Sequence, residues 1–184
     1  MFTWRDLKKR RKISSYYVQN ILSLINSEKL INNLSKHNLI LYFTLHHQVL
    51  KYQKKFRLKK YIKFIEQKDI AECLSKTNLV VTDFSSIIFD MIYRKKPYII
   101  YIPDLNDPSI KKSYKLISYN MIKNFRNHDF DFENIYLDIN STIDKINYYI
   151  NNNFLLEARL NKFYDEFNFT KKNIMNDFIY YLSK

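Results

Sequence analysis

The sequence predicts an α/β fold in which a parallel, Rossmann-like sheet has helices on both faces. Continuous apolar runs of four or five residues, typical of strands buried on both faces, alternate with segments whose apolar residues recur at helical spacing. Between residues 39 and 102 the resulting order is strand, helix, strand, helix, strand, helix, strand. With 184 residues and 46% hydrophobic content, the chain is long enough to bury one such core.

The first half of the predicted fold starts with the end of a strand at Phe2-Thr3-Trp4. A helix is expected next, because apolar residues recur at helical spacing from Val18 to Leu34. The elements expected after it are a strand over 39–43, a short helix over 49–56, a strand over 61–65 and a helix over 70–75. Asp69 stands directly before the last of these helices. Its carboxylate is expected to accept the free N–H groups of the first turn and so to cap the helix.

The second half contains the clearest strand–turn–helix–strand unit. A strand over 79–82 leads through a turn at 83–86 into an apolar helix over 87–93, and a strand follows over 98–102. Three cations and a proline at positions 94–97 are expected to end the helix, since cations are favourable at a helix C-terminus and proline cannot continue the helix.

Beyond Pro103 we expect mainly helices. The elements expected there are a helix over 114–125, a strand over 135–139, a helix over 142–150 that begins at Ser141, and helices over 154–163 and 173–182. We therefore predict a Rossmann-like nucleotide-binding domain over 1–140, with a helical C-terminal tail over 141–184 that packs on the same domain.

Composition excludes several classes of protein. Cys73 is the only cysteine, so neither a disulfide framework nor a cysteine-based zinc site is expected, and a reducing compartment is favoured. The chain has no glycine, which removes the Walker A loop and the G-x-G-x-x-G fingerprint. Positive-φ positions should then fall mostly to Asn and Asp. No group of residues has metal-ligand spacing, so no metal or other cofactor is expected.

No apolar run reaches the roughly 20 residues that a membrane span requires. The basic N-terminus is not followed by the apolar segment of a secretory signal. A cytoplasmic location is therefore the default expectation.

The net charge of +13 is concentrated at one end of the chain. Residues 1–60 hold 14 Lys and Arg against two Asp and Glu, whereas residues 61–184 hold 17 against 16. Such a basic patch attracts nucleic acids, anionic lipid headgroups or phosphorylated substrates, and charge does not distinguish these partners. Nucleic-acid binding stays an alternative because Tyr and Phe are interleaved with the cations. The chain has no recognised DNA- or RNA-binding motif, which argues against that alternative.

The turn at 83–86 is the best candidate for a binding site. Ligands of open α/β sheets bind beyond the carboxyl ends of the strands, where this turn lies. The N-terminus of a helix offers unpaired N–H groups and a positive dipole end to a phosphate, and Ser85 and Ser86 add two hydroxyl donors. The simpler alternative is that Asp83 and Ser85 only cap the helix.

Residues 79–90, followed by Lys96-Pro97 and Pro103-Asp104, resemble the signature of the CDP-glycerol glycerophosphotransferases, the teichoic acid polymerase family. Two further pieces agree with that family in order and spacing, namely Thr3-Trp4-Arg5 and Leu45-His46. The resemblance covers about residues 1–105.

The sequence departs from the family pattern at four points. Phe84 replaces a tyrosine of the signature, while Phe2 and His47 stand where the family has proline. The Arg-Gly element that follows Pro-Asp in the family is not evident, and a chain without glycine cannot contain it. Contacts from that region to the donor or acceptor are therefore not expected to follow the family.

The resemblance implies roles for seven residues: Arg5, Thr82, Ser85 and Ser86 bind the phosphates of the donor, His46 is catalytic, and Asp83 and Asp104 order the loops. A guanidinium such as that of Arg5 forms two parallel hydrogen bonds to phosphate oxygens. An imidazole such as that of His46 donates to a phosphate or assists proton transfer.

The resemblance also implies the C-terminal half of a GT-B enzyme, in which two Rossmann-like domains enclose the site. The donor is then CDP-glycerol or a related CDP-polyol. A hydroxyl of a lipid-linked or polysaccharide acceptor attacks the β-phosphate, and CMP leaves. The N-terminal acceptor domain would then be missing from this chain, which would be a fragment, a split gene product whose other half is a separate chain, or a degenerate copy. The alternative is a non-catalytic module that binds a nucleotide or a partner.

A membrane surface reconciles the charge with the family resemblance. Lys8–Lys12 and Lys51–Lys60 would dock on anionic lipid, where lipid-linked acceptors lie, and each nearby cation contributes about 1 kcal/mol in that setting. This hypothesis predicts peripheral attachment to the inner face of the plasma membrane.

Overall fold

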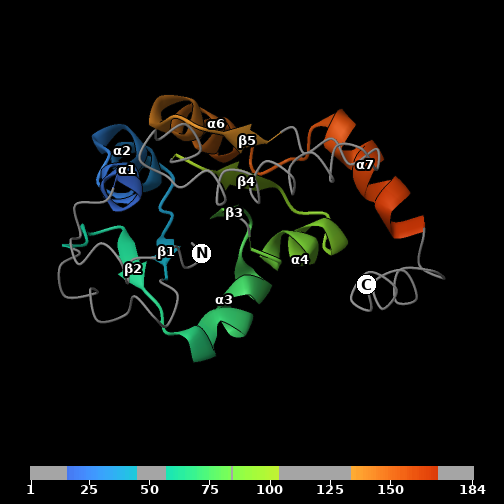
Figure 1. Cartoon of the computed structure of the whole chain (residues 1–184), viewed down its shortest axis with the longest axis horizontal. Coiled ribbons are helices and arrows are strands. Elements are labelled where there is room, and N and C mark those ends of the chain that lie inside the picture. The colour runs from blue at the N-terminus through green and yellow to red at the C-terminus, as the bar shows by residue number, and fades with distance from the viewer. Residues whose placement is uncertain (1–15, 45–56, 84, 104–133, 170–184) are drawn as a thin grey trace.

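The computed structural model describes residues 16–44, 57–83, 85–103 and 134–169 (Figure 1). The elements in chain order are α1 (Tyr16–Ile25), α2 (Glu28–Lys36), β1 (Leu41–Phe43), β2 (Ile62–Phe64), the 3-10 helix η2 (Gln67–Asp69), α3 (Ile70–Lys76), β3 (Val80–Thr82), α4 (Ile87–Tyr93), β4 (Tyr98–Tyr101), β5 (Ile135–Tyr136), α6 (Ile139–Asn151) and α7 (Ala158–Phe169). All five strands fall within the runs that the sequence predicts. The predicted helices over 49–56, 114–125 and 173–182 lie outside the described residues.

Every pairing between the described strands is parallel, which confirms the predicted α/β class. β1 pairs with β2, and β4 lies between β3 and β5. The sequence predicted one sheet, whereas the described strands form two, of two and three strands. The described strands are only two to four residues long, and β3 is hydrogen-bonded to β4 but not to β1.

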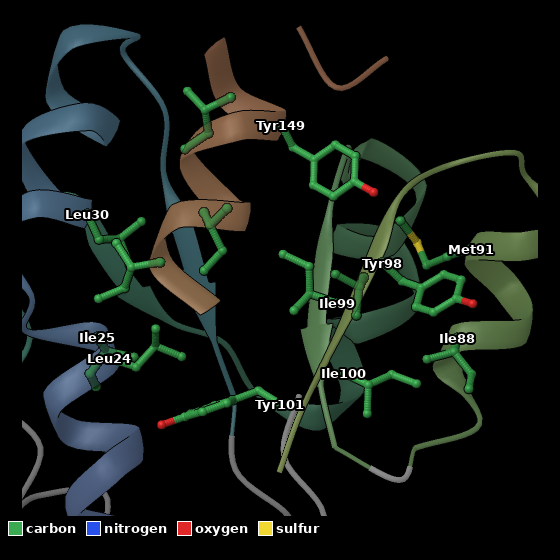
Figure 2. Close-up of a cluster of buried hydrophobic side chains, with 14 of the residues drawn as sticks. Leu24, Ile25, Leu30, Ile88, Met91, Tyr98, Ile99, Ile100, Tyr101 and Tyr149 are labelled. Carbon is green, nitrogen blue, oxygen red and sulfur yellow. The ribbon is translucent and has the colours of Figure 1, made fainter. Parts of the chain in front are cut away.

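Helices cover both faces of the three-stranded sheet. All four residues of β4 are buried, as expected for a strand with a packed layer on each side. α4 packs on β3 and β4, while α6 packs on β4, β5, α1 and α2. In Figure 2 the side chains of Tyr98 and Ile100 lie towards α4, and Tyr101 points towards α1. This layering agrees with a Rossmann-like fold.

The C-terminal helix α7 is fastened to the connection between α4 and β4. The ring of Tyr164 on α7 stacks on Tyr98 with centroids 6.2 Å apart, and its hydroxyl donates to the carbonyl oxygen of Lys96 at 2.9 Å. Burial raises the pKa of the Tyr164 hydroxyl. The boundary that the sequence analysis placed at residue 140 remains a prediction.

The segment from Val18 to Leu34 forms two helices, whereas the sequence predicted one. α1 ends at Ile25, and the hydroxyl of Ser27 accepts a hydrogen bond from the Leu30 N–H at 3.4 Å. Ser27 is therefore an N-cap that starts α2. The apolar positions alone did not reveal this break, because the same spacing continues on both sides of it.

One predicted cap and one predicted helix start are wrong. Asp69 closes the 3-10 turn η2 in a helical backbone conformation, with φ −93° and ψ −3°, and its side chain makes no capping hydrogen bond. Asp138, and not Ser141, caps α6, since its carboxylate accepts from the Ser141 N–H at 2.8 Å. This hydrogen bond to the charged form lowers the pKa of Asp138. The helix predicted over 154–163 is α7, which starts four residues later.

Three helices end in the C-terminal capping motif that usually contains a glycine, although this chain has no glycine. The N–H groups of Leu39, Lys96 and Phe154 donate to carbonyl oxygens five residues earlier, at the ends of α2, α4 and α6. The residues that take positive φ at these ends are Asn38, Lys95 and Asn153, with φ of 52°, 51° and 51°. Two of them are Asn, as composition predicts, but Lys95 and also Phe154 (φ 57°) are not.

Within the part of the chain that the structure describes, no helix is long and apolar enough to cross a membrane.

Candidate functional site

The candidate site lies where β3 ends and α4 begins. Thr82 is the last residue of β3 and, like Asp83 after it, has no exposed surface. Ser85 is 5% exposed, whereas Ser86 is exposed. The predicted strand, turn and helix are thus confirmed in place, and Ser86 is the member of this group that faces solvent.

Ser86 is the N-cap residue of α4, and Ser85 directly precedes it. The Ser85 hydroxyl oxygen accepts from the Ile87 N–H at 3.5 Å, and the Ser85 carbonyl oxygen accepts from the Ile88 N–H at 3.3 Å. The Ser86 carbonyl oxygen accepts from the Phe89 N–H at 2.9 Å. The Ser85 side chain thus bonds at the start of the helix, as the simpler alternative from sequence expects, and its phosphate contact stays a prediction. The Ser86 side chain makes no capping hydrogen bond, and the residue is exposed.

Asp83 receives a hydrogen bond from a distant helix. The Tyr17 hydroxyl on α1 donates to Asp83 Oδ2 at 2.9 Å. One turn further along α1, the Asn20 Oδ1 accepts from the Tyr101 hydroxyl on β4 at 3.4 Å. α1 therefore lies against the carboxyl ends of β3 and β4. Sequence reasoning missed Tyr17, which stands one position before the helix that was predicted from Val18, whereas α1 begins at Tyr16.

Arg5, His46 and Asp104 lie outside the described residues, so their predicted roles stay predictions. The structure does place the chain that leads to two of them. Thr44 precedes His46 by two residues at the carboxyl end of β1, and it is 4% exposed. Pro103 precedes Asp104 and is buried two residues after β4 ends. Because β3 and β4 are parallel neighbours, Thr82 and Pro103 lie at the same edge of the sheet.

Each of the two sheets has a threonine at the carboxyl end of one strand. Thr44 after β1 and Thr82 at the end of β3 are both buried. No hydrogen-bond partner of the Thr44 hydroxyl is found within the described residues. Sequence reasoning did not single out Thr44, because a lone threonine at the end of an apolar run carries no pattern.

No group of three or more metal-ligating side chains occurs among the residues that the structure describes. The cations Arg57, Lys59 and Lys60, which are part of the predicted docking segment, are exposed before β2. The Lys59 Nζ donates to the carbonyl oxygen of Asn26 at 3.2 Å. The other cations of the two docking segments lie outside the described residues.

The family model described as CDP-glycerol:poly(glycerophosphate) glycerophosphotransferase matches residues 1–173. The chain belongs to this family. The match extends beyond the roughly 105 residues over which the sequence motifs agree, and it includes the whole described structure up to α7.

A relative in Bacillus subtilis (strain 168), the minor teichoic acid biosynthesis protein GgaB, is 32% identical over 166 residues. The alignment covers 88% of this chain but only 17% of the relative. No solved structure matches the chain. The glycerophosphotransferase family member described here is therefore similar to about one sixth of a much longer teichoic acid protein.

Proposed function

We propose that this chain binds the CDP-activated donor of a glycerophosphotransferase in teichoic acid or surface-polysaccharide synthesis. The observation that carries the proposal is the family match over residues 1–173, which includes the Thr82–Ser86 turn at the carboxyl end of β3. A turn at this edge of a parallel sheet is where ligands of Rossmann-like folds bind. CDP-glycerol, or another CDP-polyol, is the donor that fits.

The proposed reaction transfers a polyol phosphate. A hydroxyl oxygen of the acceptor forms a bond to the β-phosphorus, and the bond from that phosphorus to the bridging oxygen of CMP breaks. CMP leaves with the electron pair, and the acceptor hydroxyl loses its proton. His46 is the candidate for moving this proton, and Arg5 for pairing with the phosphates. The acceptor would be a lipid-linked or polysaccharide chain.

The exposed Ser86 is the residue proposed to contact the donor, while the half of the turn that contains Thr82, Asp83 and Ser85 is buried and supports it. A serine hydroxyl at this position would donate a hydrogen bond to a phosphate oxygen, and it carries no negative charge that would repel the phosphate. Asp104 is proposed to order the loop after β4. We further propose that the acceptor half of a GT-B arrangement is supplied by another domain or chain.

Calorimetric titration with CDP-glycerol, CDP and CMP tests the proposal. Ser86→Ala is expected to weaken binding of CDP about tenfold, because a hydrogen bond to a charged group contributes about 1.5 kcal/mol or more. Ser141→Ala, at an exposed serine in the first turn of α6, is the matched control and should bind as the unchanged chain does. Ser85→Ala should mainly lower stability, since it removes the hydroxyl that accepts from Ile87.

Absence of binding to every cytidine nucleotide, in a chain shown to be folded, would refute donor binding. An equal loss in Ser86→Ala and Ser141→Ala would refute the role of Ser86 alone. Titration of the unchanged chain therefore distinguishes a failure of donor binding from a failure of the role of Ser86.

We also propose that the basic first third docks on anionic lipid at the inner face of the plasma membrane. Exposure of Arg57, Lys59 and Lys60 supports this proposal. Flotation with vesicles tests it: the chain should float with vesicles that contain anionic phosphatidylglycerol and stay behind with purely zwitterionic vesicles. Equal flotation with both kinds would contradict it.

A further inference from the structure

β1 and β2 form a two-stranded sheet of their own (Figure 1), and only one of its faces is buried. Phe43 and Ile62 are buried on the inner face, where the ring of Phe43 packs edge-on against Phe64 with centroids 6.3 Å apart. On the outer face, Tyr42 is 48% exposed, and the exposed Lys63 is its partner in the parallel register. Because successive strand residues alternate between faces, Tyr42 and Lys63 stand side by side towards solvent.

The outer face combines apolar and cationic side chains. Ile40 stands two residues before Tyr42, therefore on the same face, and it is 41% exposed. Two large apolar side chains are thus left in water on the face that carries the Lys63 ammonium group. A ligand that covers this face must offer C–H surface as well as negative charge.

The segment around the outer face carries positive charge only. Residues 29–65 contain nine Lys and Arg and no Asp or Glu. Lys29 forms an ion pair with Asp144 on α6. Among the residues that the structure describes, no acidic side chain pairs with the other cations of this segment, which are Lys36, Arg57, Lys59, Lys60 and Lys63. Cations that no acid neutralises create a field that attracts anionic ligands.

Tyr61, directly before β2, shows the effect of these cations. A hydrogen bond with Ser35 and, after it, the charge of Lys60 lower the pKa of the Tyr61 hydroxyl. The Lys60 Nζ lies 5.4 Å from the centroid of the Tyr61 ring. Ser35 is followed by Lys36, so the end of α2 brings a further cation to the start of β2.

A phosphodiester chain of polyols has the two properties that the outer face requires. The family description names poly(glycerophosphate), whose repeating unit carries one negative charge and a short run of C–H groups. The acceptor half proposed for another domain or chain would hold the reacting end of such a polymer, and the rest of a long polyanion needs a surface to lie on. Nucleic acids and lipid headgroups share the charge, but the chain has no recognised nucleic-acid motif, and Lys63 lies outside the lipid-docking segments.

We propose that the outer face of β1 and β2, with Tyr42 and Lys63 at its centre, binds the poly(glycerophosphate) chain behind its reacting end. Lys63 pairs with phosphate groups, and Ile40 and Tyr42 cover the C–H groups between them. This inference rests on the proposed function, because it assumes that the chain serves a transferase that extends such a polymer. None of these side chains touches the reacting atoms.

Calorimetric titration of the full chain with synthetic poly(glycerol phosphate) tests the inference. Lys63→Glu is expected to weaken binding about tenfold at low salt and to reduce the salt dependence of the binding constant. Lys68→Glu is the matched control, because it makes the same change in net charge at an exposed lysine that already pairs with Glu66 at 2.9 Å. The control should bind the polymer as the unchanged chain does.

A pair of tyrosine variants tests the apolar part of the face. Tyr42→Ala is expected to weaken the polymer about threefold, because it removes apolar surface that the polymer would cover. Tyr148→Ala, at a tyrosine that is 44% exposed on α6, should leave binding unchanged. Circular dichroism shows whether each variant is folded, and both exposed sites are expected to tolerate the change.

An equal loss in Lys63→Glu and Lys68→Glu would show that net charge alone acts, and it would overturn the inference. Tighter binding of poly(U) of equal charge would overturn it too, because the face would then suit nucleic acid. The same holds if Lys63→Glu lowers flotation with phosphatidylglycerol vesicles but leaves polymer binding unchanged. CDP binding should be the same in Lys63→Glu as in the unchanged chain. If the unchanged chain binds no CDP, donor binding fails, and titration with the polymer alone decides about this face.

Discussion

Lys95 occupies a backbone position that suits glycine. Lys95→Gly should therefore be more stable than Lys95→Ala, which is the reverse of the usual order in a helix. Lys95 ends α4 with φ of 51°, in the left-handed region where a Cβ atom lies too close to the carbonyl oxygen. The clash costs about 1–2 kcal/mol, and glycine avoids it. Glycine in turn costs about 0.5–1 kcal/mol through the greater freedom of the unfolded chain. Lys95→Gly should therefore be more stable than Lys95→Ala by about 0.5–1 kcal/mol.

The comparison of glycine with alanine removes the effect of the lysine side chain. The Lys95 Nζ lies 2.5 Å from Asp165 Oδ1, with both side chains 51% exposed, and both variants lose this ion pair. An exposed pair of this kind contributes at most about 1 kcal/mol. Urea unfolding followed by circular dichroism measures the difference in the free energy of unfolding. In thermal unfolding, a difference of 1 kcal/mol corresponds to a Tm shift of about 2–4 °C for a chain of this size.

Gln19 provides the matched control, since it is exposed in the middle of α1. There alanine should be more stable than glycine by about 1 kcal/mol, because the backbone is an ordinary right-handed helix. The same order at both positions, with alanine the more stable at 95, would refute the argument that positive φ strains the end of α4.

The remaining predictions concern a buried amide and a helix cap. Asn134 is 2% exposed, and its Nδ2 donates to the Tyr98 carbonyl oxygen at 3.0 Å and to the Tyr149 hydroxyl at 2.9 Å. Asn134→Leu should lower the free energy of unfolding by about 2–4 kcal/mol, since it also leaves buried acceptors unpaired; urea unfolding measures this, and a loss below about 1 kcal/mol would contradict it. The pKa of Asp138 is lowered by the Ser141 N–H, so its stabilising effect is present above the unfolded pKa and is lost as the pH falls through the folded pKa. Asp138→Asn should therefore lose less stability than the unchanged chain in acid unfolding curves, and identical acid slopes would count against this cap.

The α/β class and β4 were predictable because burial on both faces leaves a direct trace in the sequence, whereas Tyr42 of β1, predicted to be buried in the same way, is exposed. The runs at 79–82 and 98–102 contain β3 and β4, and the proline and cations after residue 93 end α4 as expected. Local patterns were less informative about helix ends. Ser27 divides the predicted helix over 18–34. Asp138 caps a helix that was expected to begin only at Ser141, because several polar residues near a helix start are equally good candidates until the backbone selects one.

The candidate site was predictable only as a position along the chain. Motif order located the Thr82–Ser86 turn and the family, and the family model agrees over residues 1–173. Spacing did not distinguish the two serines, although Ser85 accepts from the Ile87 N–H and Ser86 is exposed. It also gave no indication of Tyr17, since a hydrogen bond that spans 66 positions depends on where α1 packs.

By itself, the sequence determined the alternation of strands and helices, the absence of glycine-dependent phosphate loops, the basic first third and the family. Each of these is carried by residue type and by spacing between near neighbours, which survive in an unfolded chain. Only the tertiary structure decided that Asp83 bonds to Tyr17, that Tyr101 reaches Asn20, and that Lys95 takes positive φ. These depend on contacts between distant segments, and such contacts exist only once the core has packed.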